Sequence, residues 1–468
     1  MLELFAPGAR IDGFVVGERI HAGGNGFIYK ATPPADKDPG FPVVLKVPAI
    51  GRAQPTLAVV SFEMEQMILP VLAGPHVPRL VALGDLSATP FIAMEWIEGE
   101  SLARIIERAP LPLADVVRVG AALADAVSSV HEQEVIHLDL KPENFILRAT
   151  GEAVLLDFGF AHHARYPDLL AEEAQFAAGS APYVSPEQLH GDRSDPRSDL
   201  FALGILLYEL ATGEQPYGAP ATYAGMRDRL WREPAPPRKL DKAIPPWLQE
   251  VILRCLEPSA DARYQSAAHV AFDLRHPEQI PLTLRAARIE APGVLAQLGR
   301  WWRGKSSKPV PGRRTPVPAP VILVAIDTEH PDDERHPSLQ WTTAQVISLN
   351  AEFRLMCVSV IGAAPLGEGP TDDETASGRH LQHVLRLRQW IEPLKLPASR
   401  LSLHVIESAS AGDTLLELAR VNHVDLIVLG APGPTQKKLA WWRSVASNVT
   451  ANARCSVHVV RVPERPLA

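Results

Sequence analysis

The chain has 468 residues but only three cysteines, Cys255, Cys357 and Cys455, which lie about 100 residues apart. They form neither a CxxC pair nor an even-numbered disulfide framework, so the sequence favours a reducing compartment, and we expect a cytoplasmic protein. No run of about 18 apolar residues occurs, so we expect no membrane-spanning helix. The first ten residues, MLELFAPGAR, contain no basic segment followed by an apolar stretch, and we therefore expect no signal peptide.

Basic residues are also fewer than acidic residues. Lys and Arg number 46 against 54 Asp and Glu, which gives a net charge of −8 and a pI near 6.1. This balance argues against a nucleic-acid-binding protein. Hydrophobic residues make up 46% and charged residues 21% of the chain, a composition typical of globular proteins with a sizeable core. The length suggests two or three domains.

Proline, in contrast, is abundant, and its distribution marks a domain boundary. Some of the 44 prolines cluster in PVPGRRTPVPAP, residues 309–320, a segment that favours a semi-rigid extended spacer over helix or central strand. The overlapping stretch 300–314 carries six Lys or Arg and no acid. We therefore predict one domain over residues 1–284, a basic, proline-rich linker over 285–319, and a second domain over 320–468.

The first domain begins with short β-like runs and continues with long helical patterns. The runs FVVGERI, GFIYKA, PVVLKVP, RLVALGDL and PFIAMEWI come first, and LADVVRVGAALADAVSSVHEQ and DLFALGILLYELATG follow them. A strand-rich start and a helix-rich remainder predict an α+β domain of two lobes with a cleft between them. The small lobe is expected over about residues 1–95 and the large lobe over about 96–284.

The second domain has an alternating pattern. The apolar runs VILVAI, FRLMCVSVI, LSLHVI, DLIVL and SVHVV are separated by helical segments, one of which places Leu381, Val384, Leu387, Ile391 and Leu394 on a single face. Buried strands rich in β-branched residues that alternate with helices predict an α/β doubly wound parallel sheet covered on both sides.

The most informative segments are VIHLDLKPENFIL, residues 135–147, and LLDFGF, residues 155–160. Two aspartates and an amide in them, Asp139, Asp157 and Asn144, have a spacing suited to the transfer of a metal-bound phosphoryl group. Asp139 can orient a substrate hydroxyl and accept its proton, and Asn144 with Asp157 can hold Mg²⁺ ions that bridge the phosphates of ATP. Together the segments resemble the catalytic and metal-binding loops of protein kinases, and the resemblance extends over roughly the first 280 residues.

The kinase resemblance implies roles for further charged residues. Lys46, in VVLK, matches the strand lysine that contacts the α- and β-phosphates, and Glu65 matches its helix partner. Glu63, two residues away, is the alternative acid. Lys141, two residues after Asp139, resembles the lysine of serine/threonine kinases and would neutralise charge on the transferred phosphoryl group.

The same resemblance implies the nucleotide contacts. In IHAGGNGFIYKA, Gly23 and Gly26 match the second and third glycines of the phosphate loop, where backbone N–H groups approach phosphates closely because no Cβ intervenes. In PFIAMEWIEGESL, Met94 matches the gatekeeper residue, and the backbone of Glu95 to Ile97 would bond the adenine. An ordinary hairpin turn at the glycines and a core position for Met94 are the alternatives.

Four more residues match kinase positions that support the site. Glu187 and Arg263 are expected to form a buried structural ion pair, and Asp199 is expected to hold the backbone of the catalytic loop. Ser180 matches a threonine whose hydroxyl reaches Asp139.

Two features depart from the kinase pattern. Leu138 stands where the family commonly has the arginine that binds a phosphorylated activation loop. Residues 157–179 contain no Ser or Thr, and Tyr166 is the only hydroxyl-bearing side chain among them. We therefore predict that Ser/Thr phosphorylation of this loop does not switch on catalysis. Neutral drift at Leu138 is the alternative.

The second domain carries candidate ligand contacts of its own. Asp327 follows the first strand, at the carboxyl edge where doubly wound sheets bind ligands. The segment LGAPGPTQKKLAWWRSVASNV contains Gly430, Gly433 and Ser444, with Arg443 in place of a further glycine. These features resemble the nucleotide signature of the universal stress protein family, which implies a second ATP or AMP site. A Gly-Pro-rich surface loop without a ligand is the alternative.

Together the two resemblances predict a bacterial, eukaryotic-like serine/threonine protein kinase joined to a universal-stress-type domain. The expected reaction transfers the γ-phosphoryl group of ATP to Ser or Thr hydroxyls of protein substrates, with Mg²⁺ or Mn²⁺. The second domain would sense nucleotide or stress, or form a homodimer. Two alternatives stay open, a pseudokinase that binds nucleotide without transferring phosphate and a stress-ligand-binding protein whose kinase is the output.

Overall fold

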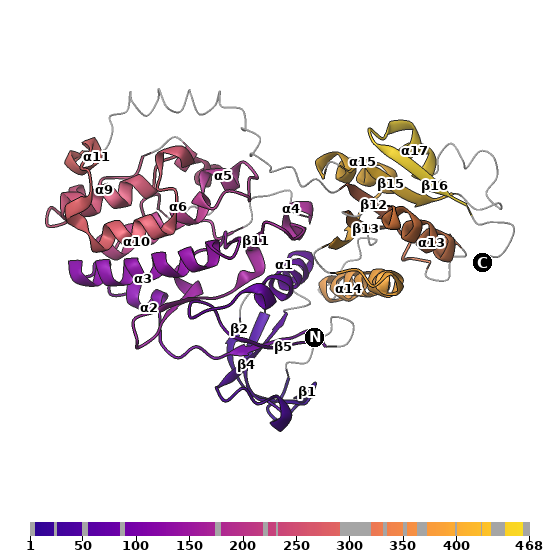
Figure 1. Ribbon diagram of the computed structural model, residues 1–468, viewed down its shortest axis with the longest axis horizontal. Coiled ribbons are helices and arrows are strands. Elements are labelled where there is room, and N and C mark those ends of the chain that lie inside the picture. The colour runs from indigo at the N-terminus through magenta and orange to yellow at the C-terminus, as the bar shows by residue number, and fades with distance from the viewer. Residues whose placement is uncertain are drawn as a thin grey trace.

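A computed structural model gives the fold of the chain (Figure 1). It describes residues 5–22, 26–48, 55–84, 89–173, 179–218, 223–230, 233–290, 320–330, 335–349, 353–362, 372–397, 400–422, 424–431 and 445–461. No helix among these residues is both long and apolar enough to cross a lipid bilayer.

The small lobe is an antiparallel sheet with the strand order β1-β2-β3-β4-β6-β5. Its strands are β1 (Arg10–Ile11), β2 (Phe14–Ala22), β3 (Gly26–Thr32), β4 (Val43–Pro48), β5 (Leu80–Leu83) and β6 (Ile92–Glu95). Strand β4, which reads VVLKVP, is buried along its whole length because it lies inside the sheet. Helix α1 (Pro55–Ile68) lies against β4 and against the turn at Phe158–Phe160.

The large lobe is mainly helical. Its helices are α2 (Leu102–Ile106), α3 (Leu113–His131), α4 (Leu169–Glu173), α5 (Pro186–Leu189), α6 (Arg197–Thr212), α7 (Tyr223–Met226), α8 (Pro237–Leu240), α9 (Pro246–Cys255), α10 (Ala267–Arg275) and α11 (Leu284–Ala287). Its short strands are β7 (Glu100–Ser101), β8 (Val135–Ile136), β9 (Phe145–Leu147), β10 (Ala153–Leu155) and β11 (His162–His163).

Helix α6 forms the centre of this lobe, because residues 198–211 are all buried. It crosses α9 closely at Gly204, where an added Cβ would lie 2.6 Å from Cys255 Cβ. The helix ends at Thr212, and the next residue, Gly213, has a φ of +75°, the left-handed conformation common after helix C-termini. The helices of the large lobe and the sheet of the small lobe form the predicted two-lobed α+β domain.

The folded part of the first domain extends beyond its predicted end at residue 284. Helix α11 packs on α9, and Arg285 in α11 is paired with Glu250 and Glu257. The predicted linker 285–319 therefore begins inside this helix, and residues 291–319 of it lie outside the described residues.

The second domain is the predicted doubly wound α/β fold, with a parallel sheet in the order β14-β13-β12-β15-β16. Its strands are β12 (Val321–Ala325), β13 (Arg354–Ile361), β14 (Leu401–Glu407), β15 (Leu426–Gly430) and β16 (Ser456–Val460), and its helices are α13 (Arg335–Ser348), α14 (Asp372–Ile391), α15 (Ala411–Val421) and α17 (Val445–Asn452). Side chains of α13 and α14 fill the core on one face of the sheet, and side chains of α15 and α17 fill the core on the other.

Candidate active site

Lys46 lies in a buried charge cluster between the sheet and helix α1. Its Nζ donates hydrogen bonds to Glu65 Oε2 at 2.5 Å and to Asp157 Oδ1 at 2.8 Å. Lys46 is 6% exposed and Glu65 is 1% exposed. Of the two candidate acids on α1, Glu65 is thus the one that bonds Lys46, whereas Glu63 bonds elsewhere.

Two carboxylates share the ammonium group of Lys46, and their pKa values move apart. Burial raises the pKa of Glu65 to about 7, although Lys46 opposes this effect. Burial also acts to raise the pKa of Asp157, but the charges of Lys46 and Lys141 outweigh it and hold that pKa well below its usual range. For Lys46, burial lowers the pKa, but Asp157 and Glu65 together keep it above its ordinary value. Asp157 is therefore ionised at neutral pH, as binding of a cation requires.

Asp139 is held by contacts at both carboxylate oxygens. Its Oδ2 accepts from Lys141 Nζ at 2.8 Å, and its Oδ1 accepts from the backbone N–H of Ser180 at 2.7 Å. The contact at Ser180 therefore uses the backbone rather than the hydroxyl that the sequence led us to expect. Asp139 is only 3% exposed, and these bonds fix the position of its side chain.

Asn144 and Asp157 provide oxygen atoms that fit a magnesium ion. Asn144 donates from Nδ2 to the backbone oxygen of Asp139 at 2.9 Å, which leaves its amide oxygen as the atom able to bind a cation. Amide and carboxylate oxygens are ligands that Mg²⁺ prefers. The described residues contain no group of three His, Cys, Asp or Glu side chains that could hold a metal. A cation here would therefore also need oxygens from a phosphate substrate.

The backbone of the catalytic loop is held by Asp199, as predicted. The carboxylate of this buried residue accepts hydrogen bonds from the backbone N–H groups of His137 and Leu138, each at 2.8 Å, and is paired with His131 Nε2 at 2.8 Å. Leu138 has a φ of +62°, a conformation that costs a non-glycine residue energy and persists only where surrounding contacts impose it. The contacts of Asp199 thus maintain the strained bend that comes immediately before Asp139.

The predicted ion pair between Glu187 and Arg263 is also present. The two groups make bidentate contacts at 2.8 and 3.0 Å, and the guanidinium bonds three backbone carbonyls as well. Arg263 is 1% exposed, so its charge depends on these partners.

The predicted nucleotide contacts are described only in part. Gly23 lies outside the described residues. Gly26 begins β3, where an added Cβ would lie 2.4 Å from Val47 O, so packing between strands is a second reason for glycine there. Met94 and Ile97 are buried at the junction of the lobes. The backbone N–H of Glu95 donates to Arg79 O at 2.9 Å, and an adenine contact at Glu95 would therefore use its carbonyl oxygen.

The C-terminal domain has a cavity of about 210 Å³ at the carboxyl ends of its strands. Asp327, Glu329, Arg335 and Gly430 are among the residues that line it. Asp327 and Gly430 follow or end the adjacent strands β12 and β15, so the fold brings these two predicted residues together. Gly433 and Ser444 lie outside the described residues.

The family models divide the chain in the same way as the fold. A model described as protein kinase domain matches residues 14–273, which is more than half of the chain. The chain belongs to the protein kinase family. A second model, described as universal stress protein family, matches residues 320–461.

The kinase domain is similar to several curated serine/threonine-protein kinases. It is 30% identical to PknB of Mycobacterium leprae over 265 residues, which is 55% of this chain and 41% of that protein. It is 31% identical to a probable serine/threonine-protein kinase of Clostridium perfringens over 221 residues, which is 47% of this chain and 32% of that protein. The chain thus spans about a third to two fifths of the length of these relatives.

The activation segment of the kinase domain contains a contact that the sequence did not reveal. Asp168 accepts from Arg193 Nε at 2.8 Å and lies 3.3 Å from His162 Nδ1. Arg193 also donates to Phe160 O at 2.9 Å, so a single guanidinium bridges two points of the segment. Because 25 residues separate Asp168 from Arg193, no local spacing in the sequence indicated this pair.

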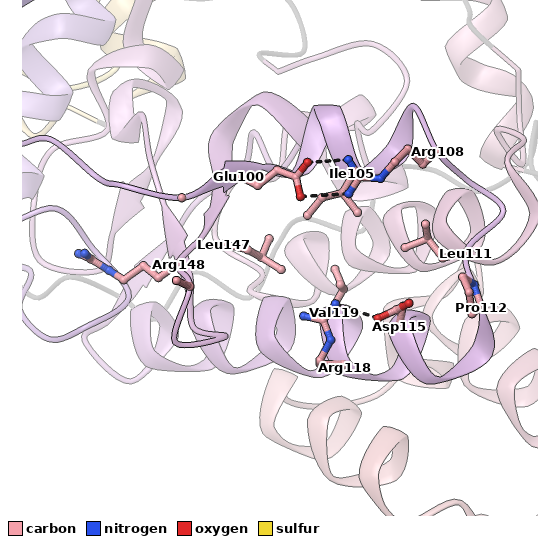
Figure 2. A pocket seen from close by; sticks show the side chains of 12 residues that line it. Glu100, Ile105, Arg108, Leu111, Pro112, Asp115, Arg118, Val119, Leu147 and Arg148 are labelled. Atoms are coloured by element: carbon pink, nitrogen blue, oxygen red, sulfur yellow. Dashed lines mark hydrogen bonds and ion pairs between the residues drawn. The ribbon is translucent and has the colours of Figure 1, made fainter.

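A larger cavity, about 650 Å³, lies in the large lobe, and its lining includes none of the candidate catalytic residues (Figure 2). It lies among α2, α3 and the strand β9. Three arginines line it. Arg108 and Arg118 are paired with Glu100 and Asp115 in its own wall, and Arg148 is paired with Glu95. Because these arginines are already paired with carboxylates, the cavity offers no evident phosphate site despite its size.

Proposed function

We propose that the chain is an ATP-dependent serine/threonine protein kinase. The observation that carries this proposal is the assembled state of the site. Lys46 is bonded to both Glu65 and Asp157 while Asp139 is held by Lys141 and Ser180. Both the lysine–glutamate pair and the metal-binding aspartate must be in place for phosphoryl transfer by protein kinases.

Each residue of the proposed active site has a role that follows from its charge and position. Asp139 would accept a hydrogen bond from the substrate hydroxyl, orient it towards the γ-phosphorus and receive its proton. Lys141, 2.8 Å from Asp139, would stabilise charge on the transferred group, and Lys46 would bind the α- and β-phosphates. Asn144 and Asp157 would hold Mg²⁺, which neutralises charge on the phosphates when bound. Lys141 supports Ser and Thr rather than Tyr as the acceptors in protein substrates, because it matches the serine/threonine type.

The test is transfer of label from γ-labelled ATP to a serine-containing peptide by the full chain and by Asp139→Asn. We expect Asp139→Asn to lower kcat by about 10²-fold or more, with little change in nucleotide affinity. Glu143→Gln, which removes an exposed acid from the same loop, is the matched control and should stay near wild type. Equal and negligible transfer by the wild type and Asp139→Asn would instead indicate a pseudokinase.

We also propose that activity does not need Ser/Thr phosphorylation of the activation loop. Leu138 is buried and carries no cation for a phosphate, whereas Asp168 and Arg193 supply a permanent ion pair within the segment. The carboxylate of Asp168 would thus serve where other kinases need a phosphate. Mass spectrometry of active protein tests this, because an essential phosphate between residues 157 and 179 would contradict it.

For the C-terminal domain we propose a second ATP or AMP site at the cavity near Asp327. This site would link the kinase to stress signals in the cytoplasm. We also propose that the domain forms a homodimer. The position of the cavity at the carboxyl edge of a doubly wound sheet supports the ligand site. Equilibrium dialysis should find two ATP per chain for wild type and one for Asp327→Lys. One ATP per chain in both proteins, together with no difference between them in bound AMP, would remove the second site.

A further inference from the structure

Helix α14 of the C-terminal domain lies against helix α1 of the kinase domain (Figure 1). Arg388 on α14 donates from Nη2 to Glu63 Oε1 on α1 at 3.0 Å. Glu63 is 6% exposed, so this cross-domain bond is largely shielded from water on the carboxylate side. A buried carboxylate needs such a partner, because an unpaired buried charge is costly.

The bond involves the acid on α1 that does not contact Lys46. Glu63 and Glu65 are two residues apart, and side chains at this spacing point to different sides of a helix. Glu65 bonds Lys46 of the small-lobe sheet, and Glu63 bonds Arg388 of the other domain. Helix α1 is therefore bonded on two sides, to the small-lobe sheet through Glu65 and to the other domain through Glu63.

Helix α14 is firmly attached to the rest of its domain. Val384, Leu387 and Trp390 are buried in the core beneath the sheet. Arg386 donates to Thr328 O at 2.6 Å, and His383 Nδ1 is 2.7 Å from Thr328 Oγ1. A helix anchored in this way can transmit a restraint to α1, which a loose segment could not.

A second charge of the C-terminal domain lies near the activation segment. Burial lowers the pKa of Arg354, at the start of β13, and the charge of Asp168 opposes this effect across the domain boundary. Asp168 immediately precedes α4, which itself packs on α1. The C-terminal domain thus contacts α1 through α14 and places the positive charge of Arg354 within electrostatic reach of Asp168.

We propose that α14 is an intramolecular docking partner of the kinase domain and that Arg388 is a positioning residue for the bond between Lys46 and Glu65. The proposal rests on the proposed kinase activity only for its kinetic readout. Loss of the contact would allow α1 to move away from β4, which weakens the phosphate contacts of Lys46 but leaves the peptide site unchanged.

The test compares Arg388→Glu, Glu63→Arg and the double variant in the full chain. Each single reversal places like charges together, and we expect at least a fivefold fall in kcat/KM for ATP, within the usual range of coupling between sites, with KM for the peptide unchanged. The double variant restores opposite charges and should return to within about twofold of wild type. Arg420→Glu is the matched control, since it reverses a charge on α15 whose contact is with Glu417 on the same helix.

Single variants that keep wild-type kcat/KM for ATP, or a double variant no better than the singles, would overturn the proposal. A second measurement separates this outcome from failure of the proposed function. Hydrogen exchange of the α1 amides should be faster in Arg388→Glu than in wild type even if the chain transfers no phosphate. Equal exchange in the two proteins would also overturn the proposal.

Discussion

The raised pKa of Glu65 predicts how the stability of the kinase domain depends on pH. Glu65 is 1% exposed, and burial raises its pKa from the ordinary 4.5 to about 7. Between these pH values the folded state keeps a proton that the unfolded chain releases. The free energy of unfolding therefore contains a contribution that is complete below pH 4.5 and is lost as the pH rises through about 7.

The size of this contribution follows from the gap between the two pKa values. At about 1.4 kcal/mol for each pKa unit, the gap corresponds to about 3 kcal/mol. The variant Glu65→Gln cannot ionise, so it lacks this contribution. Relative to Glu65→Gln, wild type should lose about 3 kcal/mol of stability between about pH 4.5 and pH 7, with little further change above about pH 8.

The assay is urea unfolding of both proteins across this pH range. Unfolding is monitored by hydrogen exchange of the amides of the buried helix α6, which reports the stability of the kinase domain alone. Other titrating groups are common to both proteins and cancel in the difference, as does any constant effect of the substitution on packing. A difference in stability that stays flat between pH 5 and pH 8, or that rises in favour of wild type, would refute the reasoning about Glu65.

Three further predictions concern the scaffold of the site. Glu187→Ala leaves the Arg263 guanidinium buried without its carboxylate, and urea denaturation should show a free energy of unfolding lower by about 3–5 kcal/mol. Arg118→Ala breaks an exposed ion pair and should lower the free energy of unfolding by less than about 1 kcal/mol in the same experiment. Asp199→Asn keeps the shape of the side chain but replaces the carboxylate that accepts hydrogen bonds from the backbone N–H groups of His137 and Leu138. Steady-state kinetics should show a lower kcat, and an unchanged kcat would contradict a role for Asp199 in holding the loop. Gly204→Val places a side chain against Cys255 and should cost about 1–3 kcal/mol, measured as a shift of the urea midpoint.

The sequence predicted those parts of the molecule that depend on local spacing. The motif around Asp139 and Asn144 is continuous in the chain, and the periodic apolar runs indicated the two-lobed domain and the parallel sheet. The choice of Glu65 over Glu63 also agreed with the contact that Lys46 makes, because helical position distinguishes the two acids. These features need only short-range information.

The features that the sequence did not predict depend on residues far apart in the chain. The bond between Arg388 and Glu63 joins positions 325 residues apart, and neither residue type is unusual on an exposed helix. The packing of α11 on α9 was missed because a four-residue helix has too short a pattern to recognise. At Ser180 the side chain suggested a hydroxyl contact, but the path of the backbone places the N–H there instead.

In the proposed mechanism, Asp157 and Asn144 hold a divalent cation that contacts the phosphates of ATP beside Lys46 and Asp139. A crystal structure of the full chain with Mg²⁺ and a non-hydrolysable ATP analogue would show whether the cation lies there. We predict metal–oxygen distances of about 2.0–2.1 Å to oxygens of both residues and to phosphate oxygens, with Lys46 still bonded to Glu65. Nucleotide bound without the metal at these two residues, or an empty cleft at saturating nucleotide, would contradict the account.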